Sequence, residues 1–197
     1  MSFLTNILYW IAMAFLMPVV VLLVVAFVWS LFMLGGFYGV YMERLKFKRD
    51  IGQVLSDLRD KNIPEFQFPE SINGNRRFMA CLKEAVTLKW HPVHVEKILA
   101  DFEVKGEKEL EASKILIRIG PMLGLMGTLI PLGPALVGLA SGDIGTMAIN
   151  MQVAFSTTVV GIFCGAIGFV THLVKKRWFV EDINNLQYIF NLARKEG

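Results

Sequence analysis

The sequence predicts an all-α membrane protein with three transmembrane helices and a helical cytoplasmic stalk. The chain has 197 residues, of which 54% are hydrophobic and 19% charged, whereas soluble proteins are about 45–50% apolar and about 25% charged. Residues 1–42, 119–142 and 144–174 contain no Asp, Glu, Lys or Arg. About 20 apolar residues suffice to cross the hydrocarbon core, so each run is long enough. This composition excludes a water-soluble enzyme.

The first uncharged run is longer than one span requires. Pro18 removes a helical hydrogen bond and clashes with the preceding turn, so we expect it to divide the run. The expected parts are an extracytoplasmic or interfacial helix over residues 1–17, with Tyr9 and Trp10 at headgroup depth, and transmembrane helix 1 over 18–42. The basic cluster follows the apolar run, which favours an uncleaved anchor over a signal peptide.

Residues 43–118 are predicted to be a cytoplasmic helical segment. Apolar residues recur at helical spacing in 46–62, two prolines and an Asn-Gly indicate a loop over 63–75, and helical patterns follow at 76–90 and 93–118. The last of these is expected to continue into the second span.

Histidine and cysteine residues invite a metal or disulfide interpretation. His91, His94 and Glu96 could bind a metal ion, but they also suit a solvated helix start with Pro92 in its first turn. Without a third ligand at a defined spacing, we favour the helix start and predict no metal site and no cofactor. Cys81 and Cys164 are expected in different compartments, so no disulfide is predicted.

The remaining segments are transmembrane helix 2 over 119–140, an outer loop over 141–146, transmembrane helix 3 over 147–174 and a cytoplasmic tail over 175–197. All 20 Lys and Arg lie within 44–118 and 175–195. Short basic segments stay on the cytoplasmic side, so we expect a multi-pass protein with its N-terminus outside and its C-terminus in the cytoplasm. The net charge of +3 reflects this orientation and indicates no nucleic-acid partner.

Spans two and three each carry a stripe of small and hydroxyl residues. Such stripes let helices approach closely in lipid, and the glycines predicted to pack the helices are Gly120, Gly124, Gly127, Gly161, Gly165 and Gly168. The hydroxyl groups either bond carbonyls of their own helix or face something polar, because unpaired polar groups in hydrocarbon cost several kcal/mol. In an antiparallel hairpin the polar groups would meet at similar depth. The residues predicted to line a polar passage there are Thr128, Thr157, Thr158 and Asn150, together with Ala154 of the small-residue stripe.

Span two contains the motif GPMLGLMGTLIPLG, and span three contains AFSTTVVGIFCGAIGF. Through these two motifs, residues 119–172 resemble the MotA/TolQ/ExbB proton-channel family. The positions that match are Pro121, Leu123, Gly124, Leu125, Gly127, Thr128, Ala154, Thr158 and Gly161, with Phe155 in place of the usual Leu.

The resemblance implies a ring of identical subunits, five in the family, in the cytoplasmic (inner) membrane. It also implies a second protein of the ExbD/TolR/MotB type, whose single transmembrane helix brings an Asp into the central passage. Thr128 and Thr158 match the two pore-facing threonines of the family.

Several positions depart from the family pattern. Val153 stands where the family commonly has Glu, and Pro131 and Pro134 are unusual in span two. The cytoplasmic segment is shorter than in flagellar-motor members, which disfavours flagellar rotation. Proton relays in membranes need ionisable groups, and the spans contain no Asp, Glu, Lys or Arg. His172 suits an interfacial position better than a relay, because basic residues follow it directly.

The sequence therefore leaves two functions open. The first is a proton-channel subunit of an ion-gradient-driven motor or energy-transducing complex. The second is a non-conducting oligomeric scaffold that packs through its Gly and Ala stripes. An enzyme is disfavoured, because the sequence offers no nucleophile with an adjacent base and no phosphate-binding glycine loop followed by Lys.

Overall fold

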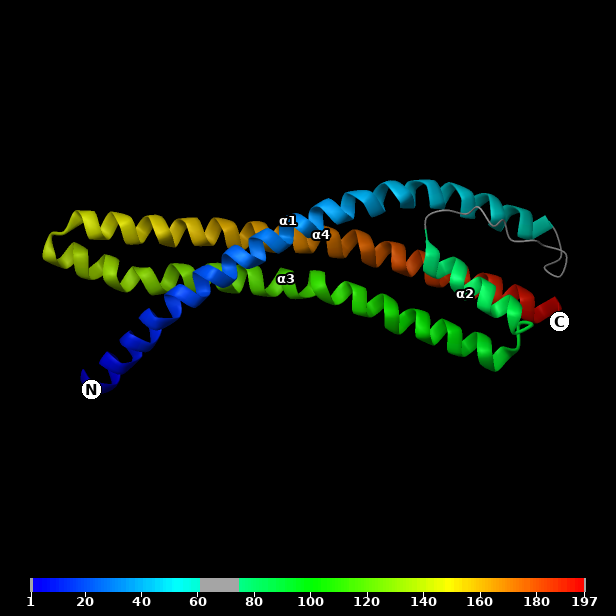
Figure 1. Ribbon diagram of the computed structural model, residues 1–197, viewed down its shortest axis with the longest axis horizontal. Coiled ribbons are helices and arrows are strands. Elements are labelled where there is room, and N and C mark those ends of the chain that lie inside the picture. Colours follow the sequence, from blue (N-terminus) through cyan, green and yellow to red (C-terminus); the bar gives the residue numbers. More distant parts are fainter. Residues whose placement is uncertain (1, 61–74, 197) are drawn as a thin grey trace. The chain divides into compact units, whose positions relative to one another are not determined.

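The computed structural model describes residues 2–60 and 75–196, which form four helices. These are α1 (Ser2–Asp60), α2 (Arg76–Thr87), α3 (Pro92–Ser141) and α4 (Ile144–Glu196) (Figure 1). The described residues include no β-strand. Within the described residues, three helical stretches are long and apolar enough to cross a membrane, namely Phe3–Arg49, Pro92–Ser141 and Ile144–Ala193. The described residues confirm the all-helical prediction, and their three long apolar stretches agree with the predicted number of spans.

The helices contribute to two compact units. We call the first the membrane unit, which comprises α1 up to Leu34 together with Ala112–His172. We call the second the charged unit, which comprises Gly35–Glu111 and the chain from Leu173 onward. Each unit is described by itself below.

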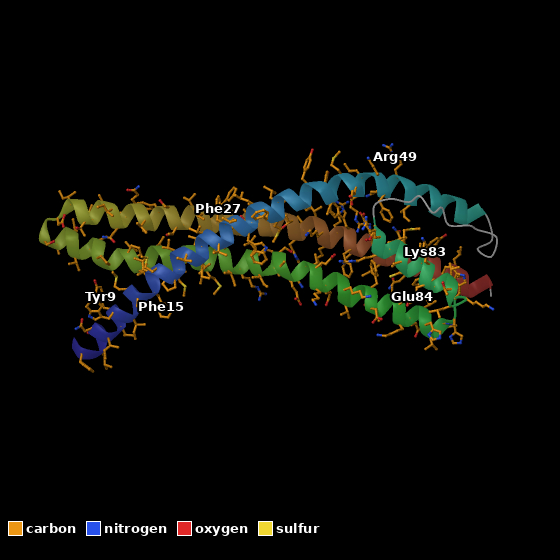
Figure 2. All side chains as sticks on the ribbon, in the orientation of Figure 1. Tyr9, Phe15, Phe27, Arg49, Lys83 and Glu84 are labelled. Atoms are coloured by element: carbon orange, nitrogen blue, oxygen red, sulfur yellow. The ribbon has the colours of Figure 1, made fainter. Side chains whose placement is uncertain are left out.

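In the membrane unit, α1 packs on both α3 and α4. Val19 and Leu23 of α1 share a buried cluster with Leu123 of α3. Ala26 shares a second cluster with residues of α3 and α4 (Leu116, Cys164 and Ile167). Phe27, labelled in Figure 2, adds a ring contact with Phe163, with 6.0 Å between the ring centroids.

A short turn joins α3 to α4, and the two helices run antiparallel (Figure 1). Gly142 has a φ of +77°, a left-handed conformation that glycine adopts without strain and that commonly ends a helix. The amide of Asp143 donates to the carbonyl of Gly138 over 2.8 Å. The Asp143 carboxylate then caps α4 by accepting hydrogen bonds from the amide and the hydroxyl of Thr146 (3.0 and 2.6 Å). These bonds to its charged form hold the pKa of Asp143 below its usual value.

The charged unit has its own hydrophobic core, to which all four helices contribute. Asn75 caps α2 by accepting a hydrogen bond from the Phe78 amide over 3.2 Å. The apolar face of α2 then packs into the core. The buried residues of this core are Phe47, Ile51, Phe78, Met79, Leu82, Ala85, Ile98, Phe102, Leu186, Ile189, Phe190 and Ala193.

A buried ion pair lies beside this core. Arg44 of α1 donates to both carboxylate oxygens of Asp182 of α4, and the Asn75 side chain donates to the same carboxylate over 2.7 Å. Burial raises the pKa of Asp182, against the opposing effect of Arg44 and Asn75. Three helices are thereby tied to a single carboxylate.

The predicted division at Pro18 is wrong as a helix boundary, because α1 continues through Pro18 from Ser2 to Asp60. A proline removes only one backbone donor, and apolar helices tolerate this where neighbouring helices pack against them; Val19, the next residue, is buried. The expected outer loop over 141–146 is also too long, since α3 ends at Ser141 and α4 begins at Ile144. Residues 61–74 of the expected loop over 63–75 lie outside the described residues, and Asn75 is the cap of α2.

Candidate functional site

Glycines bring α3 and α4 into close backbone contact. A β-carbon on Gly161 would lie 2.6 Å from the Gly120 carbonyl oxygen and 2.7 Å from the Gly124 α-carbon. Real β-carbons essentially never approach backbone atoms this closely. Only glycine therefore fits at the point where the two helices meet.

Contacts of the same kind extend in both directions along the pair. A β-carbon on Gly127 would lie 2.6 Å from Thr157 Oγ1, and one on Gly165 would lie 2.8 Å from the ring of Pro121. A β-carbon on Gly168 would lie 2.9 Å from the Ile117 amide nitrogen. The six glycines identified as packing residues thus face the neighbouring helix of the same chain.

Thr157 lies within this helix contact. It is buried, and its hydroxyl lies within hydrogen-bond distance of the carbonyls of Val153 (3.0 Å) and Ala154 (2.9 Å). Ala154 is buried as well. The side chain of Asn150, one turn further toward the start of α4, donates to the Thr146 carbonyl over 2.8 Å.

Thr128 and Thr158 differ from Thr157 in their exposure, because both are only half-buried. The Thr128 hydroxyl donates to the Leu125 carbonyl over 2.7 Å, and the Thr158 hydroxyl donates to the Ala154 carbonyl over 3.1 Å. A threonine oxygen also has two acceptor lone pairs. With the proton engaged inside the helix, each oxygen can still accept a hydrogen bond from another group.

The packing of α1 determines which way these two threonines face. On α3, Leu123 and Ile130 belong to the cluster that contacts α1, and on α4 so does Val160. Thr128 lies two residues before Ile130, and Thr158 lies two residues before Val160. Two residues turn an α-helix by about 200°. Both threonines therefore lie on the side of the α3–α4 pair that faces away from α1.

A polar contact near the other end of the membrane unit was not predicted from the sequence. Ser113 Oγ of α3 lies 3.2 Å from His172 Nδ1 of α4, and Ser113 is buried. The signal that could have found Ser113 is a spacing of seven, since Ser113, Gly120 and Gly127 form one row of small residues on α3. Ser113 lies on the N-terminal side of Arg118, outside the uncharged run that begins at Ile119.

The metal and disulfide interpretations of the sequence concern His91, His94, Cys81 and Cys164. The His91 and His94 rings lie 5.2 Å apart, between centroids, and both residues are exposed. Within the described part of the chain, no group of three or more His, Cys, Asp or Glu could hold a metal ion. Cys81 and Cys164 are both free thiols, and burial raises the pKa of Cys81.

Comparison with known proteins identifies one family. The family model described as the MotA/TolQ/ExbB proton channel family matches residues 80–187, which is more than half of the chain and includes α3 and the part of α4 up to residue 187. No curated protein matches the chain. No solved structure matches it either.

Proposed function

The chain belongs to the MotA/TolQ/ExbB proton channel family, and we propose that it is a proton-channel subunit of an ion-gradient-driven energy-transducing complex. In this proposal several copies, five by family expectation, form a ring in the cytoplasmic membrane. The α3 and α4 helices line a central passage, and α1 lies on the outer side. The passage holds the single transmembrane helix of an ExbD/TolR/MotB-type partner that carries an Asp.

The observation that carries the proposal is the common orientation of Thr128 and Thr158, away from α1. If α1 packs toward lipid at the rim, the opposite side of α3 and α4 faces the ring axis. Two half-buried hydroxyl groups would then stand at the same side of the passage. Lipid contact would give these groups nothing to bond, whereas a carboxyl group in the passage would.

The hydroxyl groups suit a carboxyl group that changes protonation. A protonated carboxylic acid is a donor, and the threonine oxygens can accept its hydrogen bond while their own protons stay on helix carbonyls. When the acid ionises it becomes an acceptor only, and rotation of each hydroxyl would redirect its proton to the carboxylate. Each threonine thus offers both partners that a proton-exchanging carboxyl group needs.

The proton carrier itself must come from the partner. The predicted spans of this chain contain no Asp, Glu, Lys or Arg, and a hydroxyl group does not ionise in the physiological range. A proton crossing a potential of 100 mV releases about 2.3 kcal/mol. A shift of that size biases a two-state equilibrium by tens-fold, since about 1.4 kcal/mol is tenfold.

The test is proton flux in proteoliposomes that contain the chain and the single-span partner that copurifies with it. We expect Thr128→Val and Thr158→Val each to reduce flux by at least tenfold while the complex still assembles, because valine keeps the shape and removes the hydroxyl. Flux is read with a pH-sensitive dye after a potential is imposed, and assembly by size-exclusion chromatography.

The matched control is Ser156→Ala. Ser156 lies on the same helix, is exposed and donates to the Gln152 carbonyl over 2.8 Å. It lies four residues before Val160, and therefore on the α1 side of α4. Its loss should leave flux unchanged.

Equal flux in the wild type and both threonine variants would refute the proposed passage. A ring that assembles without any partner and conducts nothing would favour the scaffold, although its glycines already serve contacts within one chain.

A further inference from the structure

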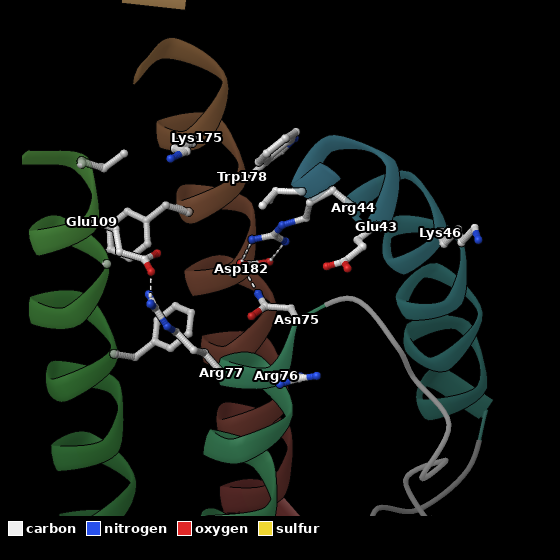
Figure 3. Close-up of a pocket in the computed structure, with 15 residues that line it drawn as sticks. Glu43, Arg44, Lys46, Asn75, Arg76, Arg77, Glu109, Lys175, Trp178 and Asp182 are labelled. Carbon is white, nitrogen blue, oxygen red and sulfur yellow. Dashed lines mark hydrogen bonds and ion pairs between the residues drawn. The ribbon is translucent and has the colours of Figure 1, made fainter. Parts of the chain in front are cut away.

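The charged unit contains a cavity of about 730 Å³ between its helices. Residues of α1, α3 and α4 line it, together with Asn75 and the first residues of α2 (Figure 3). Cationic side chains outnumber acidic ones in its lining. The cations are Arg44, Lys46, Arg76, Arg77 and Lys175, and the acids are Glu43, Glu109 and Asp182.

Two of the three acids are already engaged by cations of the lining. Asp182 is held by Arg44, and Glu109 forms an ion pair with Arg77 (Figure 3). Lys46, Arg76 and Lys175 form no ion pair with any residue that the structure describes. Among the described lining residues only Glu43 remains to balance these three cations, so this part of the lining carries an excess of positive charge.

Lys175 differs from the other two cations in its burial. Lys46 and Arg76 are exposed to solvent, whereas Lys175 is partly buried. Burial lowers the pKa of Lys175, because desolvation disfavours its charged form. Charged groups that lose water normally gain a partner. A partly buried ammonium group without a carboxylate among the described residues therefore points to an anion from outside the chain.

Aromatic residues indicate the level in the membrane at which this cavity lies. Trp178 lines it and stacks on Phe37, with 5.7 Å between ring centroids and 11° between ring planes. Tyr41 lies 5.8 Å from the same indole, and the Arg44 guanidinium lies 5.6 Å from the indole centroid. Tryptophan and tyrosine gather at the headgroup level of membranes.

The sequence positions of these residues agree with that depth. Phe37 and Tyr41 close the predicted span over 18–42, and Lys175 and Trp178 follow directly after the predicted span over 147–174. A basic cavity at the ends of transmembrane helices is the kind of site that binds the headgroup of an anionic lipid.

We propose that this cavity binds the headgroup of an anionic phospholipid, with the Lys175 ammonium group contacting its phosphate. The lipid would supply the counter-charge that Lys175 lacks among the described residues. A free phosphate ion offers the same chemistry, but the aromatic wall and the adjacent span ends favour a ligand that carries acyl chains. The proposal does not depend on the proton pathway, because it concerns other residues and another unit.

The experiment is native mass spectrometry of the full detergent-solubilised complex, titrated with phosphatidylglycerol or with phosphatidylcholine. We expect the wild type to retain phosphatidylglycerol in preference to phosphatidylcholine. We expect Lys175→Gln to weaken phosphatidylglycerol binding by about fivefold, since one Lys near the membrane surface contributes about 1 kcal/mol to anionic-lipid binding. Lys175→Arg keeps the charge and should bind phosphatidylglycerol as the wild type does. That result would show that the cavity tolerates replacement of residue 175.

Lys176→Gln is the matched control. Lys176 is the next residue, carries the same charge, is exposed and does not line the cavity, so its loss should change binding less than twofold. Equal losses in Lys175→Gln and Lys176→Gln would mean diffuse attraction and would overturn the proposal, as would equal retention of the two lipids. In lipid-free detergent, a thermal shift caused by inorganic phosphate that depends on Lys175 would assign the cavity to a soluble anion and also overturn it.

Discussion

At the scale of single residues, the geometry of the membrane threonines is compatible with both interpretations that the sequence left open. Thr128 and Thr158 donate to carbonyls of their own helices, as threonines in apolar helices commonly do. They are also half-buried on the side turned away from α1. An internal bond occupies the proton and leaves the oxygen as an acceptor, so structural satisfaction and a role in a passage are compatible.

Thr157 differs from its neighbour Thr158 for a reason of geometry. Adjacent residues on a helix point about 100° apart, and this rotation directs Thr157 against Gly127. A side chain buried between two helices of one chain is poorly placed to meet a partner. The pathway role of Thr157, Ala154 and Asn150 remains a prediction, and the burial of Thr157 and Ala154 makes them the weaker candidates.

The burial of Cys81 predicts how the rate of its alkylation depends on pH. Burial holds its thiol pKa above the ordinary value of about 8.5, and the thiolate is the reactive form. In a Cys164→Ser background, we expect iodoacetamide to modify Cys81 more slowly at pH 8 than it modifies free cysteine, with the rate still rising at pH values above 8.5. The rate should approach that of free cysteine in denaturant. A native rate profile that levels off at the ordinary thiol pKa would contradict the prediction.

At the scale of helices, α3 and α4 pack by backbone contact. The interface leaves no room for a methyl group at Gly161, because the nearest atoms belong to the backbone of α3 and cannot rotate away. Tight cores lose about 1–3 kcal/mol when overpacked, and here the strain would force the two helices apart.

We therefore expect Gly161→Ala to lower the melting temperature of the purified protein by several degrees and to reduce the assembled fraction in size-exclusion chromatography. Gly133→Ala is the control, since a β-carbon there would meet only the Tyr9 ring at 3.8 Å. It should leave both measurements near the wild-type values. Wild-type behaviour of Gly161→Ala would show that the helices do not meet at this position.

The ion pair between Arg44 and Asp182 is expected to stabilise the charged unit in a way that surface pairs do not. Removing one member of a buried pair costs about 3–5 kcal/mol, because the other charge stays buried without a partner. We expect Asp182→Ala to destabilise the protein by about 3 kcal/mol in thermal or denaturant unfolding. Glu181→Ala removes exposed pairs with Lys48 and Arg177 and should cost less than about 1 kcal/mol. Similar losses in both variants would contradict this assignment.

At the scale of the whole molecule, the charge distribution predicts one orientation in the membrane. In a cysteine-free background, Ser141→Cys should react with a membrane-impermeant maleimide in intact cells, because residue 141 is exposed at the turn between α3 and α4. Lys176→Cys, also exposed, should react only after the membrane is permeabilised. The reverse pattern would overturn the predicted topology.

Much of this architecture follows from the order of the residues. Uncharged runs of about 20 residues or more must be helical in lipid, since only helices and closed barrels satisfy every backbone hydrogen bond there. The α2 helix could be predicted from its apolar spacing, and the stripes of glycines from their recurrence. The continuity of α1 through Pro18 could not, because the cost of a proline depends on the helices that pack beside it.

Amino-acid order alone was enough to predict the three spans, the candidate hydroxyl groups and the family, because each of these depends on local composition or on a short motif. Only the tertiary structure decided which face of α3 and α4 each residue occupies. The reason is physical: a helix presents all of its faces equally until another helix covers one of them. The contact between α3 and α4 buries Thr157 and brings Ser113 to His172, and the packing of α1 leaves Thr128 and Thr158 on the uncovered side.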